Sequence, residues 1–263
     1  MQAFRDVIYA GSVAAPLFGV VLFVAYRLPG IRSKDGPTRV LTTTCVSSLV
    51  CAIVVSPLAI SALFQLWRSP DAILDVTPGK LNLGSLPPPR SASFACGVCC
   101  GYFIMDTLML LLFPKEMHKE LGGTSGYLIM WLHHVVSFLV WPYAFANGIA
   151  VWFITYFLVT EVTNIGQNLF LLADRGKIVP GAIPIGVTWA FSFAVVRVAP
   201  VPHLLYSYLK LFILQNPVQL GTMEWIVTLS TVPIPIALNL YWFYKIVKKA
   251  SRMLFPKPTS KRL

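Results

Sequence analysis

The sequence predicts an all-α, polytopic membrane protein with about seven transmembrane helices. Of its 263 residues, 56% are hydrophobic and only 12% are charged, and the mean hydropathy is +0.71. A soluble domain carries about 25% charged residues, twice that share. Because a spanning helix needs about 20 mostly apolar residues, almost the whole chain is taken up by such stretches. No room remains for a soluble catalytic domain.

The first stretch, near 4–26, is too long for a signal-peptide core and lacks an Ala-x-Ala cleavage site, so we expect an uncleaved first span. A long connection rich in Pro and Gly, 68–93, separates the second span from the third. Because proline cannot donate a helix hydrogen bond, we expect kinks in the last two spans, at Pro200 and Pro202 and at Pro233 and Pro235. The remaining spans are expected near 40–67, 94–113, 127–146, 149–172, 181–214 and 223–244.

The basic residues are distributed unequally between the two sides of these spans. Of the 21 Lys and Arg residues, about 15 fall in the loops and tail on one side and about five on the other. The positive-inside rule then predicts a cytosolic C-terminus and an N-terminus on the outer or lumenal side. The net charge of +11 fits loops beside anionic lipid headgroups. No basic stretch interleaved with aromatics indicates nucleic-acid binding.

Four ionisable residues fall within three consecutive predicted spans. Such groups are costly in hydrocarbon and usually face the interior of a helix bundle. At about 1.5 Å rise per residue, Asp106 and His134 would lie roughly 10 Å and Glu161 roughly 16 Å from the cytosolic ends of their spans. We therefore expect one polar cluster at similar depth, whereas Arg197 in the sixth span comes out nearer the far side. The clustered residues are Asp106, His133, His134 and Glu161.

Glu161, Asn164 and Asn168 are spaced i, i+3 and i+7, which places them on one stripe of the fifth span. Adjacent His133 and His134 point about 100° apart on a helix, so we expect only one of them to face the same interior as Glu161. A hydrogen bond from that histidine to Glu161 or Asp106 could simply join helices. Alternatively, the imidazole could act as a nucleophile or general base in a lipid pocket.

Other membrane chemistries find no support. The four histidines of the chain are too few for a membrane di-iron site, and no His-Glu-x-x-His is present for a zinc protease. The seventh span has no lysine for a retinal Schiff base. The five cysteines lie in apolar segments, where packing between helices is expected rather than zinc binding. We therefore expect no metal and no cofactor.

The chain resembles the TLC-domain family, which includes the ceramide synthases. The resemblance rests on Asp106 in "YFIMDTLMLLL", the histidine pair at 133–134, Asn147, and "EVTNIGQN" from Glu161, and it extends over about 38–249. It implies a six-helix barrel around a lipid-sized cavity, plus one extra helix. Around this domain we expect a first helix with a basic cytosolic loop, 1–37, and a basic tail, 250–263.

The resemblance also indicates the type of member. The synthases follow their histidine pair with a later His-Asp and a second Asp. Here Glu161-Val162-Thr163 stands in that place, similar to the Glu-x-Ser/Thr of small non-synthase members, which argues against acylation of a sphingoid base. As in the synthases, His133 or His134 is a candidate carrier of an acyl intermediate.

These observations predict a protein that binds acyl lipids within the membrane and influences lipid composition. Acyl transfer from acyl-CoA remains open, and the alternative is a non-catalytic subunit of a larger membrane assembly, contacted through 68–93. The resemblance implies the endoplasmic reticulum, with the mitochondrial inner membrane as the alternative. Candidate catalytic residues are His133, His134, Glu161 and Asp106. Candidate lipid-binding residues are Tyr102, Trp131, Asn147, Asn164 and Asn168.

Overall fold

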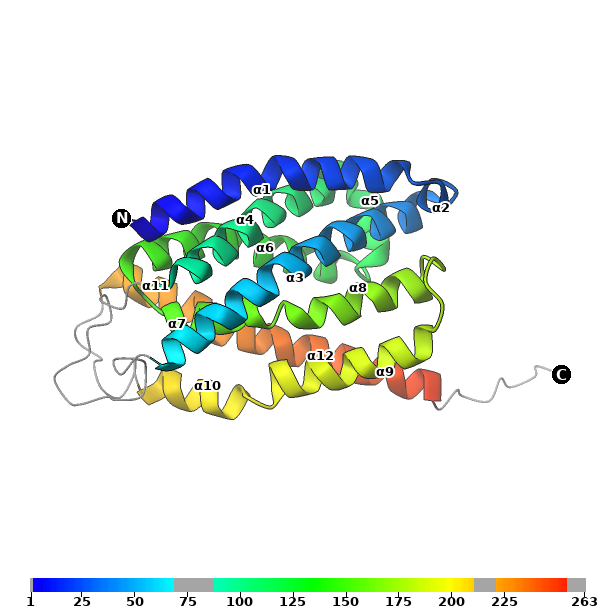
Figure 1. The fold of residues 1–263 in the computed structure, drawn as a ribbon. Coiled ribbons are helices and arrows are strands. Elements are labelled where there is room, and N and C mark those ends of the chain that lie inside the picture. Colours follow the sequence, from blue (N-terminus) through cyan, green and yellow to red (C-terminus); the bar gives the residue numbers. More distant parts are fainter. Residues whose placement is uncertain (1, 69–87, 211–220, 255–263) are drawn as a thin grey trace.

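The computed structural model describes residues 2–68, 88–210 and 221–254, and this part of the chain contains helices and no strand (Figure 1). The elements are α1 (Gln2–Arg27), α2 (Pro29–Arg32), α3 (Gly36–Arg68), α4 (Arg90–Leu112), α5 (Pro114–Glu120), α6 (Thr124–Asn147), α7 (Val151–Val159), α8 (Val162–Asp174), α9 (Ala182–Phe193), the π-helical η1 (Ala194–Val198), α10 (Val201–Tyr208), α11 (Thr222–Thr231) and α12 (Pro233–Leu254).

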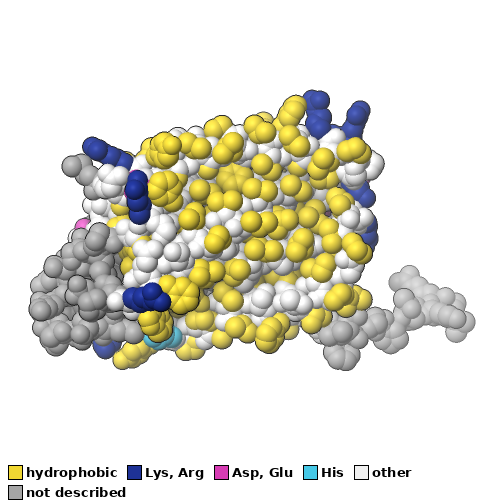
Figure 2. All heavy atoms as spheres, in the orientation of Figure 1, with side chains coloured by type: hydrophobic (Ala, Val, Ile, Leu, Met, Phe, Trp, Pro, Cys, Tyr) yellow, Lys and Arg dark blue, Asp and Glu magenta, His cyan; other side chains and the backbone are white. Residues whose placement is uncertain are grey.

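Six helical stretches in the described residues are long and apolar enough to cross a membrane. The fifth expected span, near 149–172, is not among these six: it consists of α7 and α8, which have 9 and 13 residues and are separated by Thr160 and Glu161. Neither half is long enough alone, but together they have the length of one crossing. Apolar side chains cover the middle of the surface in Figure 2, and Lys and Arg gather at its two ends. The chain is therefore an all-α, polytopic membrane protein.

The helix α1 packs closely along α4. The contact is made where α4 carries Gly97 and Gly101, the small-x-x-x-small spacing that lets transmembrane helices approach. A Cβ on Gly97 would lie 2.6 Å from the Cβ of Ala10, and one on Gly101 would lie 2.8 Å from that of Ala14. Only glycine at these two positions permits this approach.

The prolines interrupt the last two crossings, as predicted. The sixth crossing passes from α9 through η1 to α10 around Pro200. Since Pro200 has no amide proton, it cannot bond the carbonyl of Val196, which instead accepts a hydrogen bond from the hydroxyl of Tyr156 on α7. The seventh crossing breaks between Thr231 and Pro233, where α11 ends and α12 begins.

The largest buried apolar cluster occupies the end of the bundle where α7, α10 and α11 lie (Figure 1). The other end, with α2, α5 and the end of α12, contains the polar cavity described below. Three predictions lie wholly or partly outside the described residues: most of the connection 68–93, the continuation of the sixth span to 214, and most of the tail 250–263.

Candidate functional site

A cavity of about 260 Å³ lies among α3, α4, α6, α8, α9 and α12, and α1 contributes no residue to its lining. Six helical crossings thus surround it while α1 packs outside, in agreement with the expected barrel and extra helix. Seven of the nine predicted site residues line this cavity: Tyr102, Asp106, His133, His134, Glu161, Asn164 and Asn168.

The structure does not bring the other two predicted residues to the cavity. Trp131 is partly buried against the apolar side chains around Met109 and Met117. Asn147 is exposed at the end of α6, where its Nδ2 donates to the carbonyl of Tyr143 at 2.8 Å. Neither residue lines the cavity, so the structure offers no support for their proposed role in lipid binding.

Asp106 on α4 and His134 on α6 face each other across the cavity wall. Both are buried, with 6% and 3% of their surface exposed. The Nδ1 of His134 lies 3.4 Å from the Oδ2 of Asp106 but makes no hydrogen bond within the described part of the chain. The expected histidine–carboxylate pair is therefore present, as a close approach that leaves the Nδ1 of His134 without a hydrogen bond.

Both histidines line the cavity, so the prediction that only one would do so is wrong. His134 stacks on Phe103 of α4, with ring centroids 4.8 Å apart. His133 meets Trp242 of α12 edge-on at 5.6 Å. The two imidazoles leave α6 in directions about 100° apart, and both reach the cavity because it extends from α4 to α12.

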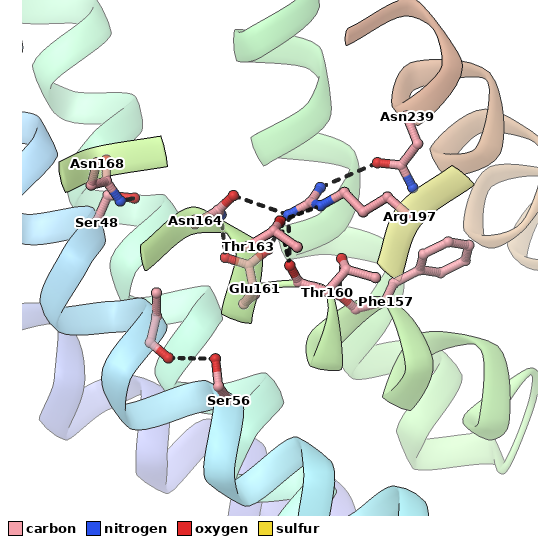
Figure 3. A network of polar contacts seen from close by, with 11 residues as sticks. Ser48, Ser56, Phe157, Thr160, Glu161, Thr163, Asn164, Asn168, Arg197 and Asn239 are labelled. Atoms are coloured by element: carbon pink, nitrogen blue, oxygen red, sulfur yellow. Dashed lines mark hydrogen bonds and ion pairs between the residues drawn. The ribbon is translucent and has the colours of Figure 1, made fainter. Parts of the chain in front are cut away.

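Arg197 of η1 belongs to the same site, which corrects the expectation that it would lie apart (Figure 3). This residue is 6% exposed, and its side chain extends from the sixth crossing to contact the fifth and the seventh. Its guanidinium donates to four oxygen atoms: the Oγ1 of Thr163 (2.7 Å), the Oδ1 of Asn239 (3.2 Å), the carbonyl of Thr160 (2.9 Å) and the Oδ1 of Asn164 (3.0 Å).

The guanidinium of Arg197 contacts the interruption between α7 and α8. The carbonyl of Thr160 accepts from the guanidinium of Arg197 at 2.9 Å as well as from the backbone N–H of Thr163 at 3.0 Å. Glu161 in the interruption has its Oε1 4.0 Å from the Nη2 of Arg197. Its Oε2 accepts from the Nδ2 of Asn164 at 2.7 Å. The carboxylate is thus paired and hydrogen-bonded, as a buried charge requires.

The stripe of α8 continues to Asn168, whose Nδ2 donates to the hydroxyl of Ser48 on α3 at 2.9 Å (Figure 3). Glu161, Asn164 and Asn168 therefore all face the cavity, as their spacing predicted. All three are also engaged with neighbouring helices, Asn168 with α3 and both Glu161 and Asn164 with η1.

The described residues contain no group of three or more His, Cys, Asp or Glu side chains that could hold a metal ion. The five cysteines are buried and free. The cavity lining offers two carboxylates, two imidazoles, three amides, a guanidinium and a lysine ammonium, together with hydroxyls and one thiol.

The sequence profile of the TLC domain matches residues 42–248, most of the chain. The chain belongs to the TLC-domain family. Its relatives include TLC domain-containing protein 4-A of Xenopus laevis and TLC domain-containing protein 4 of Xenopus tropicalis, each 25% identical over 170 residues. These alignments cover 62% of this chain and 62% and 61% of the two relatives, so the chain spans less than two thirds of their length. No solved structure matches.

The TLC domain of this chain contains every residue of the polar cluster, from Ser48 to Asn239. Family membership and the apolar crossings make it an integral membrane protein in contact with membrane lipids. The family also suggests a function related to those lipids.

Proposed function

We propose that this TLC-domain protein binds a membrane lipid, with the polar part of the lipid in the cavity beside Asp106 and His134, and thereby influences membrane lipid composition. The observation that carries the proposal is the buried Nδ1 of His134, which has no hydrogen-bond partner within the described residues and lies beside Asp106 at the cavity wall. A buried polar group without a partner costs about 1–3 kcal/mol. A ligand that bonds both groups would offset that cost.

The other half of the polar cluster is a weaker candidate for ligand contact. Four oxygen atoms already accept from Arg197, and Asn164 already donates to Glu161. A ligand would have to displace these bonds before it could form its own. We therefore assign binding to the side of the cavity formed by Asp106, His133 and His134.

The chemistry of this side favours a polar group that can both donate and accept. A carboxylate only accepts, whereas an imidazole donates from one nitrogen and accepts at the other. A hydroxyl, amine or amide of a lipid headgroup suits this pair. The apolar and aromatic lining, including Leu41, Phe103 and Phe193, suits the adjoining hydrocarbon.

Mass spectrometry of co-purified lipid tests the proposal, comparing the wild type with an Asp106→Asn/His134→Gln variant. The amount of the defined acyl lipid that co-purifies with the variant should be at least about tenfold lower, because a hydrogen bond to a charged group is worth about 1.5–3 kcal/mol. Thr155→Val is the matched control, since Thr155 is fully buried and polar but lies outside the cavity. Identical lipid profiles in a folded variant would exclude the proposed binding site.

A second candidate function is acyl transfer from acyl-CoA, and it is favoured by the carboxylate that faces the Nδ1 of His134. A carboxylate at that position fixes the orientation and tautomer of an imidazole that acts as a general base. The imidazole would take the proton of an acceptor hydroxyl or amine as that group attacks the thioester, and coenzyme A would leave as the thiol. Acyl transfer by purified wild type, abolished in His134→Gln, would support this activity.

We further propose the endoplasmic reticulum as the compartment, supported by the family resemblance alone. Co-localisation of tagged protein with markers of the endoplasmic reticulum and of the mitochondrial inner membrane distinguishes the two. A role as an accessory subunit would instead be indicated by a large stable complex whose assembly survives the Asp106→Asn/His134→Gln change.

A further inference from the structure

An apolar groove of about 310 Å³ runs between α4 and α6 on the outer side of the cavity wall. Its rim is exposed on the membrane-facing surface: the exposed fractions of the rim residues are 41% for Leu108, 38% for Phe138 and 62% for Leu139. The only polar side chain in its lining is a threonine. The lining residues are Phe103, Ile104, Thr107, Leu108, Val135, Phe138 and Leu139.

Phe103 lines both the groove and the polar cavity. Its side chain is 3% exposed, and its ring stacks on His134 with centroids 4.8 Å apart. The ring of Phe103 therefore lies between the membrane-facing groove and the imidazole of His134.

We infer that the α4–α6 groove holds the acyl chain of a bilayer lipid whose polar end lies in the cavity, with Phe103 as the gate between them. The inference rests on the proposed lipid-binding function. The groove lies on two membrane-spanning helices, so the molecules that reach it from the bilayer core are hydrocarbon chains. The geometry gives a lipid a lateral path from the bilayer, tail in the groove and headgroup past Phe103.

A helix of another protein fits this groove less well. Transmembrane helices associate closely where both surfaces carry small residues, as α1 and α4 do at Gly97 and Gly101. The rim of the groove instead carries Leu108, Phe138 and Leu139, whose bulk keeps a second backbone at a distance. A flexible acyl chain can lie between such side chains.

The test compares two leucines of α6 that differ only in their relation to the groove. Leu139 is 62% exposed and lines it, whereas Leu132 is 56% exposed and does not. Tryptophan at either position faces lipid and should leave folding intact, but only Leu139→Trp fills the groove. Retained lipid should fall about tenfold in Leu139→Trp, which displaces several methylenes from their contacts. It should stay at the wild-type level in Leu132→Trp.

Equal retention by Leu139→Trp and the wild type would overturn the inference, while the lipid loss in Asp106→Asn/His134→Gln would keep the proposed function in place. Absence of lipid from the wild type would overturn both. A second measurement uses a phospholipid with a photoreactive group midway along one chain, reconstituted with the wild-type protein. Saturable cross-links to 103–108 and 135–139 are expected. Labelling spread equally over the exposed face of α9 would contradict a defined groove.

Discussion

Replacing Arg197 with Met removes the guanidinium that joins the fifth, sixth and seventh crossings. Four hydrogen bonds are lost, and interhelical hydrogen bonds in membranes average about 0.6 kcal/mol each, or about 2.4 kcal/mol together. The carboxylate of Glu161, 4.0 Å away, also loses its cation, and breaking a buried pair from one side costs about 3–5 kcal/mol. Because both figures describe the loss of one guanidinium, they are not added, and we expect Arg197→Met to lower the free energy of unfolding by about 3–5 kcal/mol.

The assay is reversible unfolding of the purified protein in mixed micelles, followed by circular dichroism. Lys249→Met is the control, because it breaks a shorter pair, 2.8 Å to Asp174, in which Lys249 is 47% exposed and Asp174 25%. Such a pair contributes less than about 1 kcal/mol. The double variant Arg197→Met/Glu161→Gln should lose less than the sum of the single changes, since the two residues share one network. A loss in Arg197→Met no larger than in Lys249→Met would refute the reasoning.

Three further predictions concern packing, thiol accessibility and topology. Gly101→Ala should destabilise the protein by about 1–3 kcal/mol in the same unfolding assay, because the added Cβ would lie 2.8 Å from backbone and side-chain atoms of α1. Gly30→Ala is the control and should have little effect, because a Cβ at that position meets nothing within 4 Å. All five cysteines are buried and free, so a membrane-permeant maleimide should label none in the native state and all after unfolding; labelling of the native protein would place a thiol at the surface. The start of α1 and the end of α12 lie at opposite ends of the bundle (Figure 1), so tags at the two termini should be protected by opposite sides of the membrane, and protection of both from one side would contradict seven crossings.

Much of the site could be predicted because hydrocarbon imposes a severe constraint on ionisable groups. Asp106, His134 and Glu161 had to face inward, and three neighbouring helices at similar depth left one place for them to meet. The i, i+3, i+7 spacing from Glu161 was sufficient to orient α8. Asn147 was selected from the family resemblance alone, without a packing argument, and it does not reach the cavity.

The interruption between α7 and α8 could not be predicted from local sequence. The run from Val151 to Asp174 has no proline, and its one glycine, Gly166, is five residues beyond the interruption. The interruption is held by Arg197, which is distant in sequence and bonds the carbonyl of Thr160. Arg197 itself was misplaced because depth was counted at its Cα. A helical side chain tilts toward the N-terminus of its helix, so a long arginine on the sixth crossing reaches back toward the level of Glu161.

The two sides of the polar cluster have different physical roles. Arg197 donates to four protein oxygen atoms and Glu161 accepts from Asn164, and a buried ion pair held in this way contributes little net stability compared with an apolar core of similar volume. Its effect is geometric, because it fixes the interruption between α7 and α8 and the register of three crossings around the cavity. Asp106 and His134 are equally buried, but the Nδ1 of His134 has no hydrogen-bond partner among the described residues, which is a cost that helix association alone does not offset. The hydrogen-bonded side thus holds the shape of the cavity, and the side with the unpartnered imidazole nitrogen, next to Phe103 and the apolar groove, is where we expect a lipid to gain most by binding.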